Sequence, residues 1–417
     1  MQFDNLTKST DNRTYSFTLS PIHVTYANTL RRLILTGVET VAFRSDMTST
    51  GSTTDVIVKH NDTPMTNEML ADRIGLLPIH ITEPLKWKDD KYIFTLKASS
   101  DKENTVYVKA GDFKVTDISA DNFNEDEKES SMITAEQFFP VHPITKDTCL
   151  IATLQPGVGS TEQMIEIVCK ATKGTGREHA RFCPVSQCSY EYSLDSDQVR
   201  IKEMFVKWLD SAKKVANLDE TSDRYKELWR EFNTMQIKRC YKINEKNEPY
   251  SFDFTIESVG VLSVPYIVER ACDVGENMCS RYINIQTGDV PSEITISTAD
   301  SRIIGYDFLV RGHDHTLGNL FQTWIVENLI EKKLNPMVTY AGYSVPHPLR
   351  DEMILRIGVQ DGEESTARNA FAAAAKGCAK IFQELRNAWR TANGIPLLSS
   401  SVQKQVRRRP TLVSSAK

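Results

Sequence analysis

Three side chains near the middle of the chain are of types that bind metal ions. His179, Cys183 and Cys188 have the spacing H-x3-C-x4-C, and imidazole and thiolate groups are the usual ligands of structural zinc. A closed zinc site takes four ligands, and the sequence places no fourth ligand at short range. We therefore interpret the three as loop or core side chains. A metal-dependent enzyme built on them stays open as an alternative.

A second pair of metal-binding side chains, His313 and His315, also has a structural explanation. Two residues apart in an extended segment, the two rings would point to opposite sides, and no cysteine or acidic cluster accompanies them at ligand spacing. The segment instead predicts the start of a helix, with Asp314 or Thr316 as the capping residue.

A glycine-containing loop at residues 174–177, GTGR, could cradle a phosphate group. The full pattern G-x-x-x-x-G-K-[ST] is absent, and two glycines alone are a weak signal. The chain also carries the basic run 407–410, RRRP, which is typical of a solvated tail, a nucleic-acid contact or a nuclear address. An independent nucleic-acid-binding protein that uses this loop and tail is the main alternative function.

The composition is that of a globular protein without a membrane span. Hydrophobic residues make up 40% and charged residues 25% of the 417 residues, enough for two or three domains with their own cores. No apolar run approaches the ~20 residues of a membrane span, and the N-terminus lacks the pattern of a signal peptide. A net charge of −5 excludes a surface that is basic throughout. The eight cysteines include no C-x-x-C pair, so we expect reduced thiols in an intracellular, soluble protein.

A helix predicted over residues 25–38, TYANTLRRLILTGV, is the element around which the chain is arranged. Thr25 is predicted to cap it and Gly37 to end it with a left-handed turn. Alternating apolar residues over 15–19 predict a strand before it. The helix has one apolar stripe, which needs a partner, and its residues fall three and four apart: Tyr26, Leu30, Leu33 and Ile34.

A second helix of the same pattern is predicted over residues 313–330, HDHTLGNLFQTWIVENLI. The two segments align at a fixed offset, which places Asn28 on Asn319 and Leu30 on Phe321. Because both helices present one apolar stripe, we expect them to pack against each other within the molecule.

These two helices carry a resemblance to a known family. Residues 28–32, NTLRR, resemble the N-x-L-R-R signature of the alpha-type assembly subunits of multisubunit RNA polymerases, which include bacterial alpha, the archaeal D-type protein and the third-largest subunit of RNA polymerase II. Residues 315–320, HTLGNL, and 340–349, YAGYSVPHPL, are similar to the small partner subunit, which is the archaeal L-type protein or the eleventh subunit. The chain looks like both halves of a heterodimer in one polypeptide, an arrangement similar to that of some large nucleocytoplasmic DNA viruses.

The resemblance implies an intramolecular dimer interface, in which the two signature helices pack together with a last helix that extends to residue 390. The residues expected there are Asn28, Leu30, Leu33, Ile34, His315, Leu317, Gly318, Asn319, Phe321, Trp324, Phe371, Phe382 and Trp389.

Two further segments resemble regions at which the family docks its large subunits. Residues 68–79, EMLADRIGLLPI, are similar to the block D-x-R-x-G-L-x-P-I, and residues 174–185 are similar to G-x-G-K-E-H-A-K-W-x-P-V, with Arg at both Lys positions. On composition alone, the first segment is an ordinary amphipathic helix that Thr66 caps and Gly75 ends. The expected docking residues are Arg31, Arg32, Asp72, Arg73, Leu76, Leu77, Pro78, Gly176, Arg177, His179, Arg181, Tyr343, Pro346, His347 and Pro348.

The fold expected from the resemblance is α+β, with two pseudo-symmetric sheet-plus-helix dimerisation units paired within one chain and an inserted, mainly β domain. Several relatives bind zinc or an iron–sulfur cluster in the insert through four cysteines, but here only Cys149 and Cys169 occur, so we expect no metal or other cofactor. The predicted parts are a first unit at 1–45 and 173–280, the insert at 46–172, a linker at 281–296, a second unit at 297–395 and a basic tail at 396–417.

Some predicted elements are not required by the family. Two helices are expected over residues 199–215 and 223–232. Asp195 and Asp197 superficially suggest a metal-binding carboxylate pair, but acids at a helix start are the better interpretation. The polar run 47–55 and the acidic run 122–131 are interpreted as loops.

The expected function is that of a non-catalytic assembly scaffold of a DNA-directed RNA polymerase. Hydrolase, zinc-protease and nucleotide-loop motifs are absent, as are the polymerase's own catalytic aspartates, N-A-D-F-D-G-D. The implied partners are the two largest catalytic subunits and a small subunit of the same complex. DNA and RNA are contacted only indirectly, and no homo-oligomer is expected. If the protein is viral, we expect it in the host cytoplasm and the virion, with the nucleus an open alternative.

Overall fold

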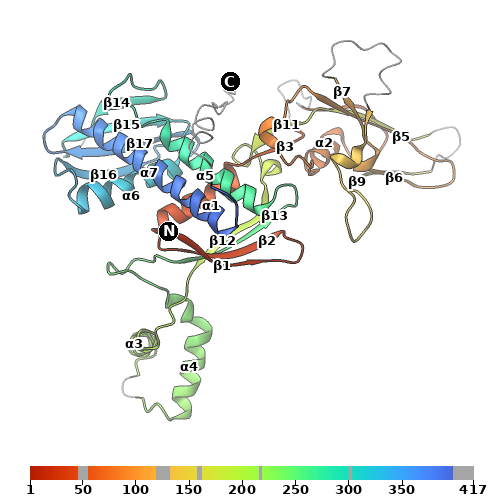
Figure 1. Ribbon diagram of the computed structural model, residues 1–417. Helices are drawn as coiled ribbons and strands as arrows, with labels where there is room; N and C mark the ends of the chain where they lie inside the picture. The colour runs from red at the N-terminus through yellow and green to blue at the C-terminus, as the bar shows by residue number, and fades with distance from the viewer. Residues whose placement is uncertain (46–54, 119–131, 157–161, 216–217, 300–302, 398–417) are drawn as a thin grey trace. The chain divides into compact units, whose positions relative to one another are not determined.

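The computed structural model describes the chain except for residues 46–54, 119–131, 157–161, 216–217, 300–302 and 398–417 (Figure 1). It divides into two compact units: unit 1 contains Met1–Leu33, Gln187–Ile256 and Val268–Lys417, and unit 2 contains Ile34–Ser186 and Glu257–Ile267. Helices and antiparallel strands are mixed in the described residues, which confirms the predicted α+β class. The predicted domain boundaries stay a prediction. Below, the first half of unit 1 means its residues up to 282, and the second half means those from 294 on.

The first half is built on a four-stranded sheet of order β1-β2-β13-β12. Tyr15, Phe17 and Leu19 are buried and their neighbours are half-buried, so the predicted strand is confirmed. β1 was not predicted, because Phe3 is its one buried apolar residue. The elements are β1 (Gln2–Lys8), β2 (Thr14–Ser20), β12 (Val185–Tyr192) and β13 (Phe252–Ser258), with helices α1 (Val24–Thr36) and α5 (Val264–Ser280).

The ends of α1 differ from the prediction. The Nδ1 atom of His23 accepts a hydrogen bond from the backbone N–H of Thr25 at 3.2 Å, and α1 already begins at Val24. The predicted Thr25 cap is therefore wrong, and Thr25 lies buried in the first turn. Gly37 is not among the described glycines with positive φ, so the predicted left-handed turn there is wrong as well.

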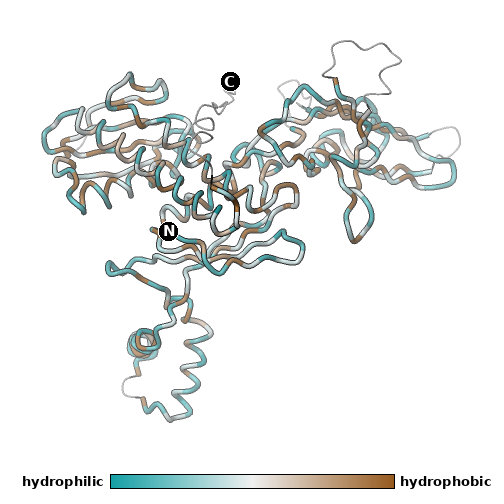
Figure 2. The backbone as a smooth tube through the Cα atoms, viewed as in Figure 1, coloured by the Kyte–Doolittle hydropathy of each residue, from teal (hydrophilic) through white to brown (hydrophobic). Residues whose placement is uncertain are grey.

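The second half repeats this plan with a four-stranded sheet of order β14-β15-β17-β16. The Asp314 carboxylate accepts a hydrogen bond from the backbone N–H of Thr316 at 2.8 Å, which confirms the predicted start of the signature helix. The predicted last helix is also present, and its apolar residues recur along one side (Figure 2). The elements are β14 (Ile294–Thr298), β15 (Gly305–Arg311), β16 (Val338–Ser344), β17 (Glu352–Val359), α6 (His315–Ile325), a π-helical continuation η8 (Val326–Glu331) and α7 (Glu364–Ala392).

A helical hairpin is inserted in the first half between β12 and β13. It has its own small aromatic core, in which Phe205 and Phe232 lie 5.3 Å apart between ring centroids. Asp197 accepts a hydrogen bond from the backbone N–H of Val199 at 3.0 Å, so its predicted role at a helix start is confirmed. The hairpin contains α3 (Gln198–Trp208), a π-helical turn η6 (Leu209–Lys213), α4 (Asp223–Met235) and a short 3-10 helix η7 (Ile237–Arg239).

Unit 2 contains the predicted insert, folded around sheets of order β4-β10-β5-β7-β8, β11-β3 and β6-β9. The hydroxyl of Thr66 accepts a hydrogen bond from the backbone N–H of Met69, which confirms the predicted cap of α2 (Asn67–Gly75). The strands are β3 (Glu39–Ala42), β4 (Val56–Asn61), β5 (Tyr92–Ser99), β6 (Val106–Lys109), β7 (Lys114–Asp117), β8 (Met132–Ile133), β9 (Leu150–Leu154), β10 (Met164–Cys169) and β11 (Thr172–Thr175). The short 3-10 helices are η1 (Pro84–Lys86), η2 (Ala110–Asp112), η4 (Ala135–Gln137) and η5 (Ala180–Phe182).

Three predicted segments lie largely or wholly outside the described residues. They are the polar run 47–55, the acidic run 122–131 and the basic tail 396–417. In the part of the chain that the structure describes, no helix is both long enough and apolar enough to cross a membrane.

Gly176, in the GTGR loop, lies where no side chain fits. An added Cβ would be 2.2 Å from the carbonyl oxygen of Leu35, and the backbone N–H of Arg177 donates to the carbonyl of Thr36 at 3.2 Å. The loop therefore packs with its backbone against the end of α1.

We predict that Gly176→Ala lowers the free energy of unfolding by about 1–3 kcal/mol, because backbone must move to admit the methyl group. Urea unfolding of the whole chain measures this difference. The matched control is Gly288→Ala, whose added Cβ would lie 3.4 Å from its nearest neighbour and should change stability by less than about 0.5 kcal/mol. Equal effects of the two substitutions would contradict the prediction.

Candidate functional site

The two signature helices contact each other in unit 1. The hydroxyl oxygens of Thr25 and Thr323 are 3.1 Å apart, and Thr25 also accepts a hydrogen bond from the Asn319 amide at 3.5 Å. The Tyr26 hydroxyl donates to the Glu327 carboxylate at 2.7 Å. Burial and the neighbouring Glu327 charge raise the pKa of Tyr26 far above its usual 10.0, so the hydroxyl keeps its proton. Polar side chains thus join α1 to α6 and η8 beside their apolar stripes.

Arg32 links α1 to the start of α6. Its Nε donates to the Thr316 hydroxyl at 2.9 Å, and its Nη2 lies 3.3 Å from the Asp314 carboxylate. The side chains of the ion pair are 37% and 35% exposed, so the pair adds little stability, but Asp314 is also the cap of α6. Arg32, which is predicted to dock a large subunit, therefore contacts the second half of unit 1. Its docking role stays a prediction.

The predicted interface residues lie in different surroundings. His315 and Gly318 both meet the ring of Tyr343, and Trp324 lies against Gly377, so these contacts lie within the second half and not between the halves. Gly318 is buried, and so are eight other predicted residues: Leu30, Leu33, Ile34, Leu317, Phe321, Phe371, Phe382 and Trp389. Asn28 and Asn319 are half-buried, and Asn319 is the one that donates to Thr25 of α1.

The second helix pair, α5 and α7, crosses closely at Gly275. A Cβ added there would be 2.7 Å from the ring of Phe382. One end of α7 continues to Trp389, whose ring packs on Phe3 and Phe17 of the first sheet with centroid distances of 5.1 and 5.2 Å. A bulky aromatic residue of the second half thus completes the core of the first half.

The first half makes the reciprocal contact with Tyr282, which follows α5. Its ring packs on Phe371 at 5.9 Å and on Phe321 at 6.5 Å between centroids. Its hydroxyl is 2.8 Å from the Nε2 atom of His313, just before α6. Each half therefore buries an aromatic side chain in the other.

Buried charges also join α5 to α7. Arg386 is 3% exposed and forms ion pairs with Asp273 and, at 2.8 Å, with Glu276. Arg390, one turn after Arg386 in α7, pairs with Glu269, one turn before Asp273 in α5. Burial favours a lower pKa for Arg386, but the hydrogen bond to Asp273 and the nearby carboxylate charges outweigh it and raise the pKa. The guanidinium therefore stays charged.

These charges were not among the predicted site residues, although the sequence carries a signal for them. Arg386 and Arg390 lie one turn apart and next to the apolar positions Leu385 and Trp389 of α7. Charged residues beside a buried stripe need partners, which points to acids of opposite sign on another helix.

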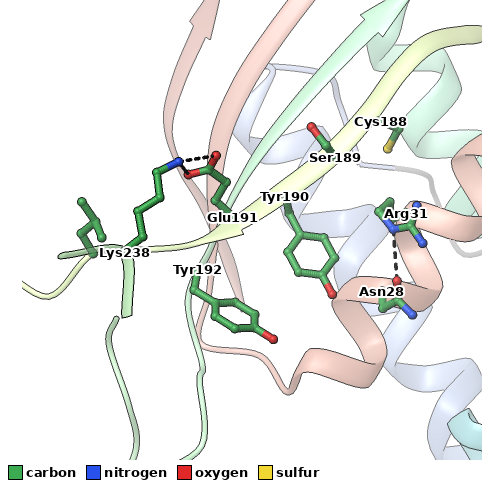
Figure 3. Close-up of a pocket in the computed structure, with 9 residues that line it drawn as sticks. Asn28, Arg31, Cys188, Ser189, Tyr190, Glu191, Tyr192 and Lys238 are labelled. Carbon is green, nitrogen blue, oxygen red and sulfur yellow. Dashed lines mark hydrogen bonds and ion pairs between the residues drawn. The ribbon is translucent and has the colours of Figure 1, made fainter. Parts of the chain in front are cut away.

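A depression of about 590 Å³ lies beside α1 in unit 1 (Figure 3). The Asn28 side chain accepts a hydrogen bond from Arg31 Nε at 3.1 Å, and both line this depression. The opposite wall comes from the edge strand β12 and from the base of the helical hairpin, where Lys238 pairs with Glu191 at 2.9 Å. The other lining residues are Cys188, Ser189, Tyr190, Tyr192 and Leu194.

In unit 2, one series of hydrogen bonds connects two of the predicted docking segments. The Ser45 hydroxyl donates to Asp72 at 2.8 Å and accepts from Arg181 at 2.5 Å, and Arg181 Nε donates to His179 Nδ1 at 3.0 Å. Gly75 makes room for this series, since a Cβ there would be 2.5 Å from Arg181 Nη1. Residues about a hundred positions apart in sequence thus form one surface network.

The outer side of α2 exposes apolar groups. Met69 and Leu76 are 60% and 65% exposed, and Arg73 lies between them at helical spacing. Leu77 is 6% exposed and belongs to the core of unit 2, so the structure explains it without a partner. In the second half, the predicted docking residues Pro346, His347 and Pro348 are exposed, while Tyr343 is half-buried.

The side chains considered for a zinc site have other partners. His179 Nδ1 accepts hydrogen bonds from Arg181, and the Cys183 thiol contacts the carbonyl oxygens of Leu35 at 3.4 Å and Val185 at 3.2 Å. Among the residues that the structure describes, no group of three or more His, Cys, Asp or Glu is arranged to hold a metal ion. The expected lack of a cofactor stays a prediction.

Two family models match this chain. Both describe an RNA polymerase Rpb3/Rpb11 dimerisation domain, one over residues 16–279 and the other over residues 306–388. The first match covers more than half of the chain, since it spans 264 of 417 positions (279 − 16 + 1). The chain belongs to the RNA polymerase Rpb3/Rpb11 dimerisation domain family. The alpha-type resemblance of the segment NTLRR is thereby confirmed.

Relatives occur in eukaryotes and archaea. The chain is 26% identical over 318 residues to human DNA-directed RNA polymerases I and III subunit RPAC1, which covers 66% of this chain and 82% of the human protein. It is 24% identical over 283 residues to DNA-directed RNA polymerase subunit Rpo3 of Methanosphaera stadtmanae, covering 64% of this chain and 93% of that protein. Yeast RPAC1 is 28% identical over 200 residues, or 44% of this chain and 54% of the yeast protein.

We predict that Arg386→Met lowers the free energy of unfolding by about 3–5 kcal/mol, because Asp273 and Glu276 then keep buried charges without this cation. Guanidinium unfolding measures the loss. The control is Arg350→Met, because Arg350 is 70% exposed in its pair with Glu352 and its removal should cost less than about 1 kcal/mol. Losses of similar size would show that burial of the cluster is unimportant.

A second prediction concerns the ion pair of Arg44 and Glu178 in unit 2, with contacts of 2.5 and 2.9 Å. The Arg44 hydrogen bond holds the pKa of Glu178 below its usual 4.5 despite partial burial. A lowered carboxyl pKa stabilises the fold above about pH 4.5, and this contribution is lost as the pH falls. Glu178→Gln should therefore be less stable than the native protein near neutral pH, and the difference should shrink in acid. Unfolding curves over a pH series test this, and a constant difference would contradict it.

Proposed function

We propose that the chain is a non-catalytic assembly subunit of a DNA-directed RNA polymerase and that it forms, within one polypeptide, the dimer platform on which two large catalytic subunits dock. The observation that carries the proposal is the reciprocal packing of α1 on α6 and of α5 on α7 in a protein that two dimerisation-domain models match. The names of RPAC1 and Rpo3, which designate RNA polymerase subunits, support it.

The single-chain arrangement has a physical advantage in assembly. Joining the halves converts a bimolecular encounter into an intramolecular one, with an effective concentration in the millimolar range for a short linker. The connection between the halves is short, since Tyr282 already packs on the second half and β14 begins at Ile294. Both halves are then made in equal amounts, as in the single-chain subunits of some large nucleocytoplasmic DNA viruses, to which we propose this protein is similar.

Exposed apolar groups next to fixed charges support the docking role of unit 2. Protein interfaces combine apolar anchors with arginine, and the outer side of α2 presents Met69, Arg73 and Leu76 together. Arg73 also donates to the backbone carbonyl of Leu150 at 3.0 Å, which limits its motion. A pre-ordered arginine loses less entropy on binding than a free one.

Phosphate binding by the GTGR loop is the alternative function, and the structure supports it less well. The loop would need open backbone N–H groups, but the N–H of Arg177 is bonded to Thr36 and Gly176 lies against the carbonyl of Leu35. This geometry favours a packed structural turn over an anion cradle.

Affinity purification of the tagged protein from its native source tests the proposal. We expect recovery of two very large polymerase subunits in equal amounts with the tagged protein, together with a small subunit. Recovery of the tagged protein without large subunits would overturn the proposal.

We also predict that Leu76→Asp combined with Arg73→Glu reduces recovery of the large subunits at least tenfold, because both changes oppose docking at α2. The matched control in unit 2 is Lys102→Glu, an exposed charge reversal outside α2, which should leave recovery unchanged. A double variant with native recovery would show that α2 does not dock a partner.

A further inference from the structure

The two helices that cross at Gly275 carry charges of opposite sign on their facing sides. Glu269, Asp273 and Glu276 follow one another at spacings of four and three, so they share one side of α5. Arg386 and Arg390 are four residues apart and share one side of α7. The negative side thus belongs to the first half and the positive side to the second.

These charges are inside the interface and not at its margin. Glu276, Arg386 and Arg390 are 4%, 3% and 9% exposed. Arg270 adds one positive charge on α5, 4.0 Å from Asp273, and it too is buried. A charge at such a position needs a partner of opposite sign, since water cannot replace the partner.

The cluster is not arranged for the greatest stability. The Nε atom of Arg386 is buried and has no hydrogen-bond partner among the described residues. A buried ion pair often stabilises no better than well-packed apolar residues of the same volume, because the charges must first lose their hydration. Such a pair does select its partner, because a buried charge that faces a like charge or an apolar group is left uncompensated.

We propose that the ion-pair cluster of α5 and α7 is the determinant that makes each half accept the other half and reject a second copy of itself. The acidic side of α5 is complementary to a helix that presents two arginines one turn apart. This inference rests on the pairing of the halves within the proposed function, and not on the docking of large subunits.

Shape alone does not give this selectivity. Each half is a four-stranded sheet with two long helices, and each inserts one aromatic residue, Tyr282 or Trp389, into the other. Two first halves paired in the same way would bring the acids of α5 against the acids of its copy. Two second halves would bring Arg386 and Arg390 against a second pair of arginines. The sign of the charges on α5 and α7, and not the shape of the halves, therefore distinguishes the native pair from a pair of two first halves or two second halves.

The test uses two full-length variants, each with the charges reversed on one helix. The α5 variant carries Asp273→Lys and Glu276→Lys, and the α7 variant carries Arg386→Glu. Within either variant like charges then face each other, which should weaken pairing of its halves by about two orders of magnitude or more. The pair of Arg390 with Glu269 is left intact throughout.

Co-expression of the α5 variant and the α7 variant under different tags should restore complementarity between the two molecules. The introduced lysines of the α5 variant then face the introduced acid of the α7 variant. The native acids of the α7 variant face the native Arg386 of the α5 variant. We expect a 1:1 exchanged dimer that both tags recover, shown by native mass spectrometry and light scattering. All three substitutions in one polypeptide should give a stable monomer again.

Lys380→Glu is the matched control, because Lys380 lies on the exposed side of the same helix as Arg386. This control should stay monomeric and should not associate with the α5 variant. The proposal is overturned if the α5 and α7 variants each stay stable monomers, or if neither co-expression nor the triple variant restores stability. The polymerase subunits are absent from this test, so its failure would leave the docking proposal standing, and failed docking would leave this result standing.

Discussion

The apolar sides of the four long helices in unit 1 are the constraint on which the rest of the structure depends. Each half of unit 1 is completed by an aromatic side chain of the other half. Trp389 fills a space beside Phe3 and Phe17, and Tyr282 fills the matching space beside Phe371. Because a packed core tolerates few voids, removal of either half would expose the core of its neighbour.

The sequence predicts those features that depend on local pattern. The helices α1, α6 and α7 follow from a period near 3.6, and β2 follows from strict alternation. β1 could not be predicted in this way, because Phe3 alone is buried and its partner Trp389 lies at the other end of the chain. The cap of α1 was misplaced because a histidine ring, which is not a usual capping group, accepts the hydrogen bond.

The candidate sites show the same limit. Residues in signature segments were identified because their order in the chain is distinctive, and α2 and the GTGR segment were both found in this way. The series of contacts from Asp72 through Ser45 to Arg181 was not, since spacing in sequence does not reveal which distant side chains meet. The partners of Arg386 and Arg390 do not follow from the apolar period of α7 for a related reason, because charged residues on most helices are solvated.

The helical hairpin that contains α3 and α4 leaves and rejoins the first sheet at a closed stem. The backbone N–H of Ser193 donates to the carbonyl of Ser251 at 3.0 Å, and their hydroxyls are 2.8 Å apart. The hairpin has its own aromatic core, and its two ends lie side by side. An insertion of this kind can be lengthened, shortened or exchanged during evolution without disturbing the strands β12 and β13 on either side of it. A change in the length of the hairpin therefore leaves the paired helices α1, α5, α6 and α7 as they are.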